Sequence, residues 1–480
     1  MHLAKYIVLA LSLSLFAEAC GDDDDAQSGS DLDATVTGST GDGGARDGGI
    51  DASAPIRTDA GTTPSANPLV TPDQQAAEKL ALALVASPPV RAARERLKAA
   101  WLAQATRVGG VPDEARATLD ATVDEAIFSA ALSLGNTDPA RPKVVSILAP
   151  PHASLGVQLP GSRITFDNPD TTYRTIPVDP AARYVIRGRR HREGPVDVNF
   201  SLWDARNATL ANLTGADIRP DAEGRYTITV GAGPGDGTSP HLTLAPSAAS
   251  IFVRNTIDAW GTQKFDELSV ERVGGPSAPT PAPTAEQLAE VLAQRLDALS
   301  GSFASFNQLS YATPVNTLPP LTLGGADGRL ATQIGTYSAF SLKDDEALVL
   351  NVRLGGAKYF IAPVYNRWMI TTDYVAHTQT LNLAQAVPNP DGSYTFVIAP
   401  SDPGVYNWVD TVGIHDGLLN LRWQGLPSVA AAEPPAATLT RIALRDLRAS
   451  LPPTTRYVTS EERRAQLAER TRSHAALYAD

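Results

Sequence analysis

Part of this 480-residue chain repeats itself, and the repeat limits the folds that the chain can adopt. The segment TTYRTIPVDPAARYVIRG at 171–188 aligns without a gap with GTYSAFSLKDDEALVLNV at 335–352. Farther along, GRYTITV at 224–230 matches GSYTFVI at 392–398. Matches that occur in the same order predict two copies of one structural unit.

Two pairs of single residues extend the repeat. Arg254 and Arg422 follow the second matched segment of their copies at the same distance, and Trp203 and Trp368 follow the first at nearly the same distance. A feature that both copies contain favours a role in the fold over a role in one active site. We therefore interpret the two arginines as structural residues.

Each copy lies in a region with the pattern of an all-β domain. Short runs rich in Val, Ile, Tyr, Phe and Thr are separated by Gly, Pro, Asn or Asp over 143–275 and again over 331–427. This spacing is typical of sandwiches and barrels. The predicted fold class is mainly β with helical additions (α+β), with two tandem jelly-roll-like antiparallel β-sandwich domains that arose by internal duplication.

Helical patterns fill the rest of the folded part. Apolar residues recur at helical spacing over 71–136, which predicts helices that pack against a larger body. Thr284 begins a further helix with Gln287 as the partner in a capping box. Near the end of the chain, two more helices are predicted over 438–451 and 460–478, the second behind a capping box that begins at Thr459.

These patterns divide the chain into seven parts. They are a signal peptide (1–19), a disordered acidic Gly/Ser/Asp tether (20–70), a helical segment (71–136), a first β-sandwich domain (143–275), a Pro-rich linker and helix (276–330), a second β-sandwich domain (331–427) and C-terminal helices (428–480).

The first twenty residues predict export. Lys5 precedes the apolar run YIVLALSLSLFA, which has the length of a secretory signal core and is too short to span a bilayer. The following AEAC resembles a bacterial lipoprotein cleavage site, so Cys20 is predicted to carry the lipid that anchors the protein to a membrane. The alternative is an ordinary signal peptide with an incidental cysteine. We expect a cell-envelope location, with the outer membrane or cell surface favoured.

The formal net charge of −12 arises mainly in the tether. Residues 20–62 contain ten Asp and no Glu, against Arg46 and Arg57. Such a segment has little to bury and should stay disordered. The acidity therefore does not describe the folded domains, and neither the charge nor the export signal suggests a nucleic-acid partner.

Common catalytic motifs are absent from the sequence. There is no G-x-S-x-G elbow, H-E-x-x-H helix, P-loop or C-x-x-C pair. The seven histidines are scattered, and no two have metal-ligand spacing. We predict no cofactor and no metal site, and an enzymatic role is the less favoured interpretation.

One loop of the second domain concentrates groups that bind ligands. A Trp beside carboxylates and an amide suits sugar recognition, because the ring covers an apolar sugar face while the polar groups bond around it. An Asp with a nearby His can instead form an acid/base pair. The third interpretation is that the Trp plugs the sandwich and the acids cap a turn. The candidate binding residues are Asn407, Trp408, Asp410, His415 and Asp416, together with Asp373 and His377.

Several segments resemble a bacterial family. FDNPDTTYRTIPVD, RYVIRG and APSDPGVYNWVDTVGIHDGLLNLRWQGLP look like proteins that carry the uncharacterised domain numbered twelve-fourteen, often paired with one numbered twelve-fifty-four. The resemblance covers roughly 143–275 and 331–427. It implies two jelly-roll-like sandwiches with helical additions, and it implies no catalytic residue because the family has no settled function.

Two hypotheses of function follow. The first is a lipid-anchored envelope protein with a non-enzymatic binding or structural role, in which the partner is a glycan or another envelope component. The alternative is a secreted hydrolase-like enzyme that uses the Asp/His loop of the second domain. The oligomeric state is left open.

Overall fold

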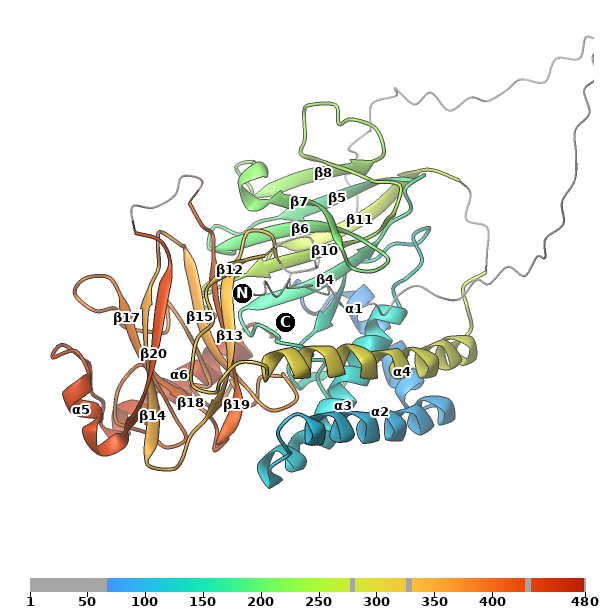
Figure 1. Ribbon diagram of the computed structural model, residues 1–480. Helices are drawn as coiled ribbons and strands as arrows, with labels where there is room; N and C mark the ends of the chain where they lie inside the picture. The colour runs from blue at the N-terminus through green and yellow to red at the C-terminus, as the bar shows by residue number, and fades with distance from the viewer. Residues whose placement is uncertain (1–66, 277–280, 325–329, 428–432, 479–480) are drawn as a thin grey trace, which may run out of the picture.

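A computed structural model describes residues 67–276, 281–324, 330–427 and 433–478. Within these ranges two β-sandwiches lie side by side, and a layer of helices packs beside them (Figure 1). The fold class predicted from the sequence is confirmed. The predicted signal peptide, Cys20 and nearly all of the tether lie outside the described residues.

The helical layer joins a segment before the first sandwich to a segment between the two sandwiches. Its helices are α1 (Pro72–Val85), α2 (Pro88–Arg107), α3 (Asp113–Leu134) and α4 (Ala285–Ser310). The α2 and α4 helices pack together, with Trp101 stacked on Phe303 at 4.4 Å between ring centroids. Their apolar stripes form one core with the start of the first sandwich and the outer face of the second, where Tyr365 and Leu418 lie.

The first sandwich consists of two sheets and a small hairpin. One sheet has the order β1-β4-β10-β6-β7 and the other has the order β11-β5-β8-β9. The strands are β1 (Val145–Leu148), β4 (Thr171–Pro177), β5 (Arg183–Arg189), β6 (Asp197–Asp204), β7 (Thr209–Thr214), β8 (Arg225–Gly231), β9 (His241–Thr243), β10 (Ala248–Thr256) and β11 (Glu267–Gly274). The hairpin pairs β2 (His152–Ser154) with β3 (Val157–Leu159), and a short 3-10 helix, η1 (Gly215–Asp217), follows β7.

The second sandwich has the same topology. Its sheets have the orders β12-β13-β19-β15-β16 and β18-β17-β14-β20. The strands are β12 (Thr322–Leu323), β13 (Ile334–Ser341), β14 (Glu346–Arg353), β15 (Tyr359–Tyr365), β16 (Thr380–Asn382), β17 (Tyr394–Ala399), β18 (Trp408–Asp410), β19 (Asp416–Gln424) and β20 (Ala436–Ala443). Each copy even contains one parallel pair, β8 with β9 and β17 with β18. This shared order supports the interpretation of the repeat as a duplication.

The two sandwiches meet through equivalent strands. Thr256, the last residue of β10, donates a hydrogen bond from Oγ1 to Oε1 of Gln424, the last residue of β19, at 3.0 Å. Two residues earlier on each strand, Arg254 and Arg422 are both buried. Arg254 covers aromatic rings of its own sheet, and Arg422 donates to the carbonyl of Asp167 in the connection between the helical layer and β4. Both arginines therefore hold the fold together.

The two repeated tryptophans are not equivalent in three dimensions. Trp203 lies on β6 and stacks on Phe252 at 4.1 Å. Trp368 lies beyond the end of β15 and donates from Nε1 to the carbonyl of Ala115 in α3 at 2.7 Å. Their similar spacing in the sequence does not reflect a shared position.

The prediction of a helix over 438–451 is wrong for most of its length. Residues Ala436–Ala443 form β20, which pairs with the whole of β14 in antiparallel register. A 3-10 turn, η2 (Leu444–Asp446), and the single-turn helix α5 (Leu447–Ser450) follow. The β-branched Thr438, Thr440 and Ile442 recur at every second residue, which suits a strand. The open edge of β14 supplies the backbone partner that turns this segment into one.

The last helix, α6 (Ser460–Ala475), begins at the predicted capping box between Thr459 and Glu462. The box between Thr284 and Gln287 that begins α4 is also confirmed. Within the described part of the chain, no helix combines the length and apolar character needed to cross a membrane.

Candidate functional site

The predicted sugar-binding tryptophan is part of a small core. Trp408 is only 7% exposed, and its neighbours include Val349 and Leu447. Its Nε1 donates to the carbonyl of Ala399 at 3.0 Å, and the Arg463 guanidinium lies 5.0 Å from its ring centroid. The face of the ring is therefore covered and is not presented to a sugar.

The Asn407 side chain also has a structural role, because its amide bonds to backbone groups. Its Nδ2 donates to the carbonyls of Val387 at 2.8 Å and Thr395 at 3.0 Å, and its Oδ1 accepts from the Val387 backbone N–H at 2.8 Å. A side-chain amide that bonds backbone groups in this way replaces part of a sheet ladder. It holds the chain where β17 passes to β18.

The structure joins Asp410 and His377 into a pair. Oδ2 of Asp410 lies 2.8 Å from Nδ1 of His377. The carboxylate is buried at the end of β18, and this burial raises its pKa, whereas the His377 side chain is 39% exposed. The other carboxylate oxygen accepts from the backbone N–H of Val412 at 2.7 Å. A buried carboxylate thus orients an imidazole at the surface, an arrangement that can exchange protons.

The backbone beside this pair is unusual. Val412 has φ 54°, which is a rare conformation for a β-branched residue, and Gly413 follows at φ 74°. Such strain persists where surrounding contacts hold it, and it is concentrated at functional sites. Here the bond from Val412 to Asp410 is one of those contacts.

His415 and Asp416 belong to a different cluster. Nδ1 of His415 lies 2.9 Å from Oε2 of Glu114, near the start of α3, and its Nε2 lies 2.8 Å from Oδ1 of Asp344. The bond to Glu114, followed by the bond to Asp344, raises the pKa of His415. Glu114 Oε1 also accepts from the backbone N–H groups of His415 and Asp416. This cluster fastens the second sandwich to the helical layer.

Asp373 is exposed and caps its own turn by accepting from the backbone N–H groups of Val375 and Ala376. Of the seven candidate residues, the structure therefore brings Asp410 to His377 and attaches His415 and Asp416 to Glu114. It does not gather the set into one concave site.

The duplication provides an internal comparison for the Asp410–His377 pair. In the matched parallel ladders, Asp410 pairs with Ala399 and Thr243 pairs with Gly231. The first copy therefore has a threonine where the second has the buried carboxylate. A feature found in one copy only is not required by the shared topology.

A second group of polar residues was missed by the sequence analysis. A cavity of about 30 Å³ lies where the connection before β4 meets α6 and the segment after β15. We call this the junction cavity; its polar lining residues are Arg163, Asp167, Asn168, Thr171, Thr172, Tyr173, Tyr374, His474 and Tyr478. They come from three parts of the chain that are far apart in the sequence: residues 163–173, Tyr374 and residues 474–478. The local signal was weak: residues 163–170, RITFDNPD, mix polar and apolar side chains without a strand or helix pattern.

Buried charges surround this cavity. Arg163 donates from Nε and Nη2 to Glu125 of α3, at 2.8 and 2.5 Å. Desolvation raises the pKa of Glu125 despite the nearby guanidinium. Asp167 accepts from both the backbone N–H and the hydroxyl of Thr371, and its pKa is also raised by burial.

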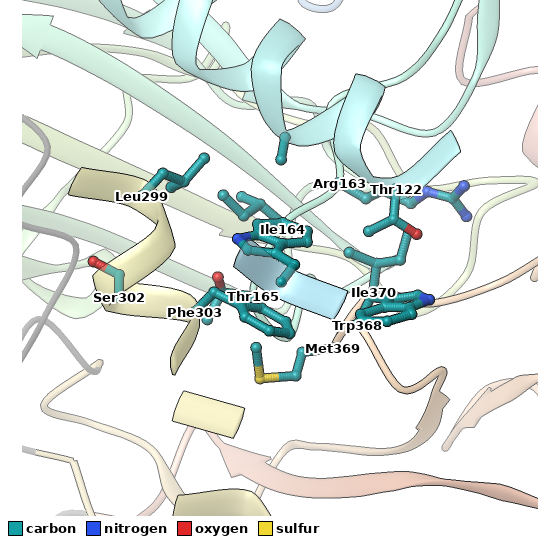
Figure 2. Close-up of a pocket in the computed structure, with 12 residues that line it drawn as sticks. Thr122, Arg163, Ile164, Thr165, Leu299, Ser302, Phe303, Trp368, Met369 and Ile370 are labelled. Atoms are coloured by element: carbon teal, nitrogen blue, oxygen red, sulfur yellow. The ribbon is translucent and has the colours of Figure 1, made fainter. Parts of the chain in front are cut away.

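A smaller cavity of about 10 Å³ lies on the other side of Arg163, toward α4. Figure 2 shows Leu299, Phe303 and Trp368 around it, with Arg163 at its edge. A water molecule needs at least about 10–15 Å³ and several polar partners. This cavity is a packing gap in an aromatic core rather than a ligand site.

Comparisons with known proteins identify the fold alone. No family model and no curated protein matches the chain. The structure is similar to the crystal structure of an uncharacterised protein from Burkholderia cenocepacia, with a TM-score of 0.63 and 24% identity over 77% of this chain and 100% of that one. The VPA0106 protein from Vibrio parahaemolyticus is also matched, with a TM-score of 0.36 and 11% identity over 57% of this chain and 90% of that one.

Proposed function

We propose that this chain is an exported, lipid-anchored protein of the bacterial cell envelope, and that its tandem sandwiches have a non-enzymatic structural or binding role. The signal-like run and the AEAC segment that ends at Cys20 support the proposed location in the cell envelope. The resemblance to the domain family numbered twelve-fourteen supports a bacterial source, and we propose the chain as a relative of that family.

One observation carries the non-enzymatic part of the proposal. The loop with the strongest sequence signal for ligand chemistry is used to hold the fold together. Trp408 fills a core, Asn407 bonds backbone groups and His415 fastens the sandwich to α3. Within this proposal, a glycan or another envelope component would bind elsewhere on the body than at the Trp408 ring.

The proposed membrane anchoring is tested by fractionating cells that express the wild type or Cys20→Ser. We expect the wild type in the membrane pellet and the variant in the soluble exported fraction, because the acyl chains supply the membrane affinity. A variant that still pellets with membranes would contradict lipid anchoring at Cys20.

The role of the loop is tested by a thermal-shift panel of divalent metals, oligosaccharides and peptidoglycan fragments. We expect Trp408→Ala to lower Tm strongly, since removing a buried Trp costs about 3–5 kcal/mol, and His415→Ala to lower it less. We also expect any ligand that stabilises the wild type to stabilise both variants equally. A ligand whose shift disappears in Trp408→Ala but not in His415→Ala would instead establish recognition at the ring.

A second candidate function is acid/base chemistry at the Asp410–His377 pair. The 2.8 Å contact between a buried carboxylate and a 39% exposed imidazole favours it. We expect that any esterase or glycosidase turnover by the purified protein would be lost in His377→Gln and kept in His152→Gln, whose ring stacks on Tyr478 in another region. Turnover that survives His377→Gln would exclude this pair.

A further inference from the structure

The junction cavity is bordered by polar side-chain groups that make no hydrogen bond within the described residues. His474 is 7% exposed and Tyr374 is 3% exposed. Both contact other rings, with Tyr374 and His474 5.6 Å apart between centroids. Throughout the described ranges of the chain, no hydrogen bond is made by either ring nitrogen of His474 or by the hydroxyl of Tyr374.

Tyr478 adds a third group of this kind. Its ring stacks on His152 at 5.1 Å and tilts against His474 at 5.5 Å. Its hydroxyl likewise has no hydrogen-bond partner among the residues that the structure describes. All three residues line the junction cavity, and none of the three makes a side-chain hydrogen bond within the described residues, although polar groups in such places are normally bonded to protein or water.

The volume and chemistry of the cavity indicate what fills it. Apolar cavities stay dry, whereas a polar cavity holds water when it offers about 10–15 Å³ and two to four partners per molecule. At about 30 Å³, the junction cavity has room for about two molecules of that size. We propose that the junction cavity is an internal hydration site in which about two water molecules link His474 and Tyr478 to Tyr374 and to the Asp167 carboxylate.

The charges around the cavity favour a neutral occupant over an ion. Arg163 is paired with Glu125, and Asp167 accepts two bonds from Thr371. Burial, with the nearby Arg470, lowers the pKa of His474 to about 4, so its imidazole is neutral at pH 7. A neutral imidazole and phenol hydroxyls both donate and accept, and water satisfies both kinds of group.

The site has a consequence for α6. Arg470 attaches the middle of the helix directly, through Nε to the carbonyl of Tyr374 and through Nη2 to Oγ1 of Thr380. His474, one turn later, makes no such bond. The water molecules therefore supply the polar attachment of the last turn of α6 to the junction of the two sandwiches, which is independent of the envelope role proposed above.

The test uses Tyr374→Phe, which removes only the hydroxyl. If water bonds to this hydroxyl, its loss leaves the water one partner short, and we expect Tm to fall by about 1–3 °C. If the cavity is dry, the variant removes an unsatisfied buried group, and Tm should stay the same or rise. A rise or no change overturns the proposal.

A matched control is Thr411→Val. The Thr411 hydroxyl is fully buried and has no hydrogen-bond partner among the residues that the structure describes, and Thr411 does not line the junction cavity. Its removal should leave Tm unchanged or raise it, which shows how a dry hydroxyl behaves in this protein. A crystal structure of the wild type supplies the second measurement. Water density within 3.2 Å of both His474 and Tyr374 is expected, and an empty cavity overturns the proposal whatever the variants show.

Discussion

Replacing Asp170 with alanine is expected to lower the free energy of unfolding by about 3–5 kcal/mol. Asp170 is fully buried, and its carboxylate accepts three hydrogen bonds: from Trp260 Nε1 at 2.7 Å, from Tyr359 Oη at 2.8 Å and from Asn382 Nδ2 at 2.8 Å. Trp260 follows β10 of the first sandwich, whereas Tyr359 and Asn382 belong to the second. Alanine would leave the buried Trp260 Nε1 without its acceptor, and it would remove one of the two acceptors that Tyr359 Oη and Asn382 Nδ2 each have at the contact between the domains, where Asn168 Oδ1 and the Asp258 carbonyl remain.

Urea unfolding of the purified wild type and Asp170→Ala measures this loss. Asp391→Ala is the control, because Asp391 is exposed and bonds only within its own turn; its unfolding curve should match the wild type. If Asp170→Ala unfolds at the same urea concentration as the control, the carboxylate does not hold the two sandwiches together.

The same residue predicts a pH dependence with a definite sign. Burial raises the pKa of Asp170 from 3.8 to about 6 in the folded protein. Between these values the native state binds more protons than the unfolded state, so this group stabilises the fold below about pH 4 and loses that contribution as pH rises through 6. The stability of the wild type relative to Asp170→Asn should therefore decrease from pH 4 to pH 7 in urea unfolding measured at each pH.

Breaking the Glu125–Arg163 pair is expected to have an effect of similar size. The pair lies between α3 and the connection before β4, where the Glu125 side chain is 3% exposed and the Arg163 side chain 11%, and Arg163 also donates to the carbonyls of Thr371 and Thr372. Glu125→Leu would leave the guanidinium buried without its counter-ion, and such a change costs about 3–5 kcal/mol. Arg163→Met should cost a comparable amount by leaving the carboxylate unpaired.

The double variant separates this mechanism from ordinary loss of packing. Replacing both members with apolar residues removes both buried charges, which is often close to neutral. We therefore expect Glu125→Leu/Arg163→Met to be much more stable than the sum of the single losses, in a double-mutant cycle measured by urea unfolding. Additive losses would show that the two side chains act independently.

The sequence was most informative where structure depends on neighbouring residues. The alternation of β8 and its match in β17 predicted strands, because side chains point to opposite faces at every second residue. The capping boxes at Thr284 and Thr459 predicted the first turns of α4 and α6, since each satisfies free backbone N–H groups within four residues. The repeat predicted a shared topology because matching sequence patterns in the two copies form the same strands in the same order.

The candidate site depends on contacts between residues that are far apart in the sequence, which local sequence patterns do not reveal. Asp410 bonds His377, which comes 33 residues earlier, and His415 bonds Glu114, which comes 301 residues earlier. The sequence placed Trp408 in a loop rich in polar residues, but α5 and Arg463 cover its ring only after the chain has folded.

The sequence by itself determined the class of the fold, the duplication and most element types, because these follow from periodicity and from caps within a few residues. The tertiary structure decided between helix and strand for residues 436–443, whose alternating β-branched residues suit a strand, because the open edge of β14 supplied the backbone partners. It also decided which polar groups are buried together around Asp170 and the junction cavity. Burial makes an unpaired polar group costly, and the partners that relieve this cost come from elements far apart in the chain.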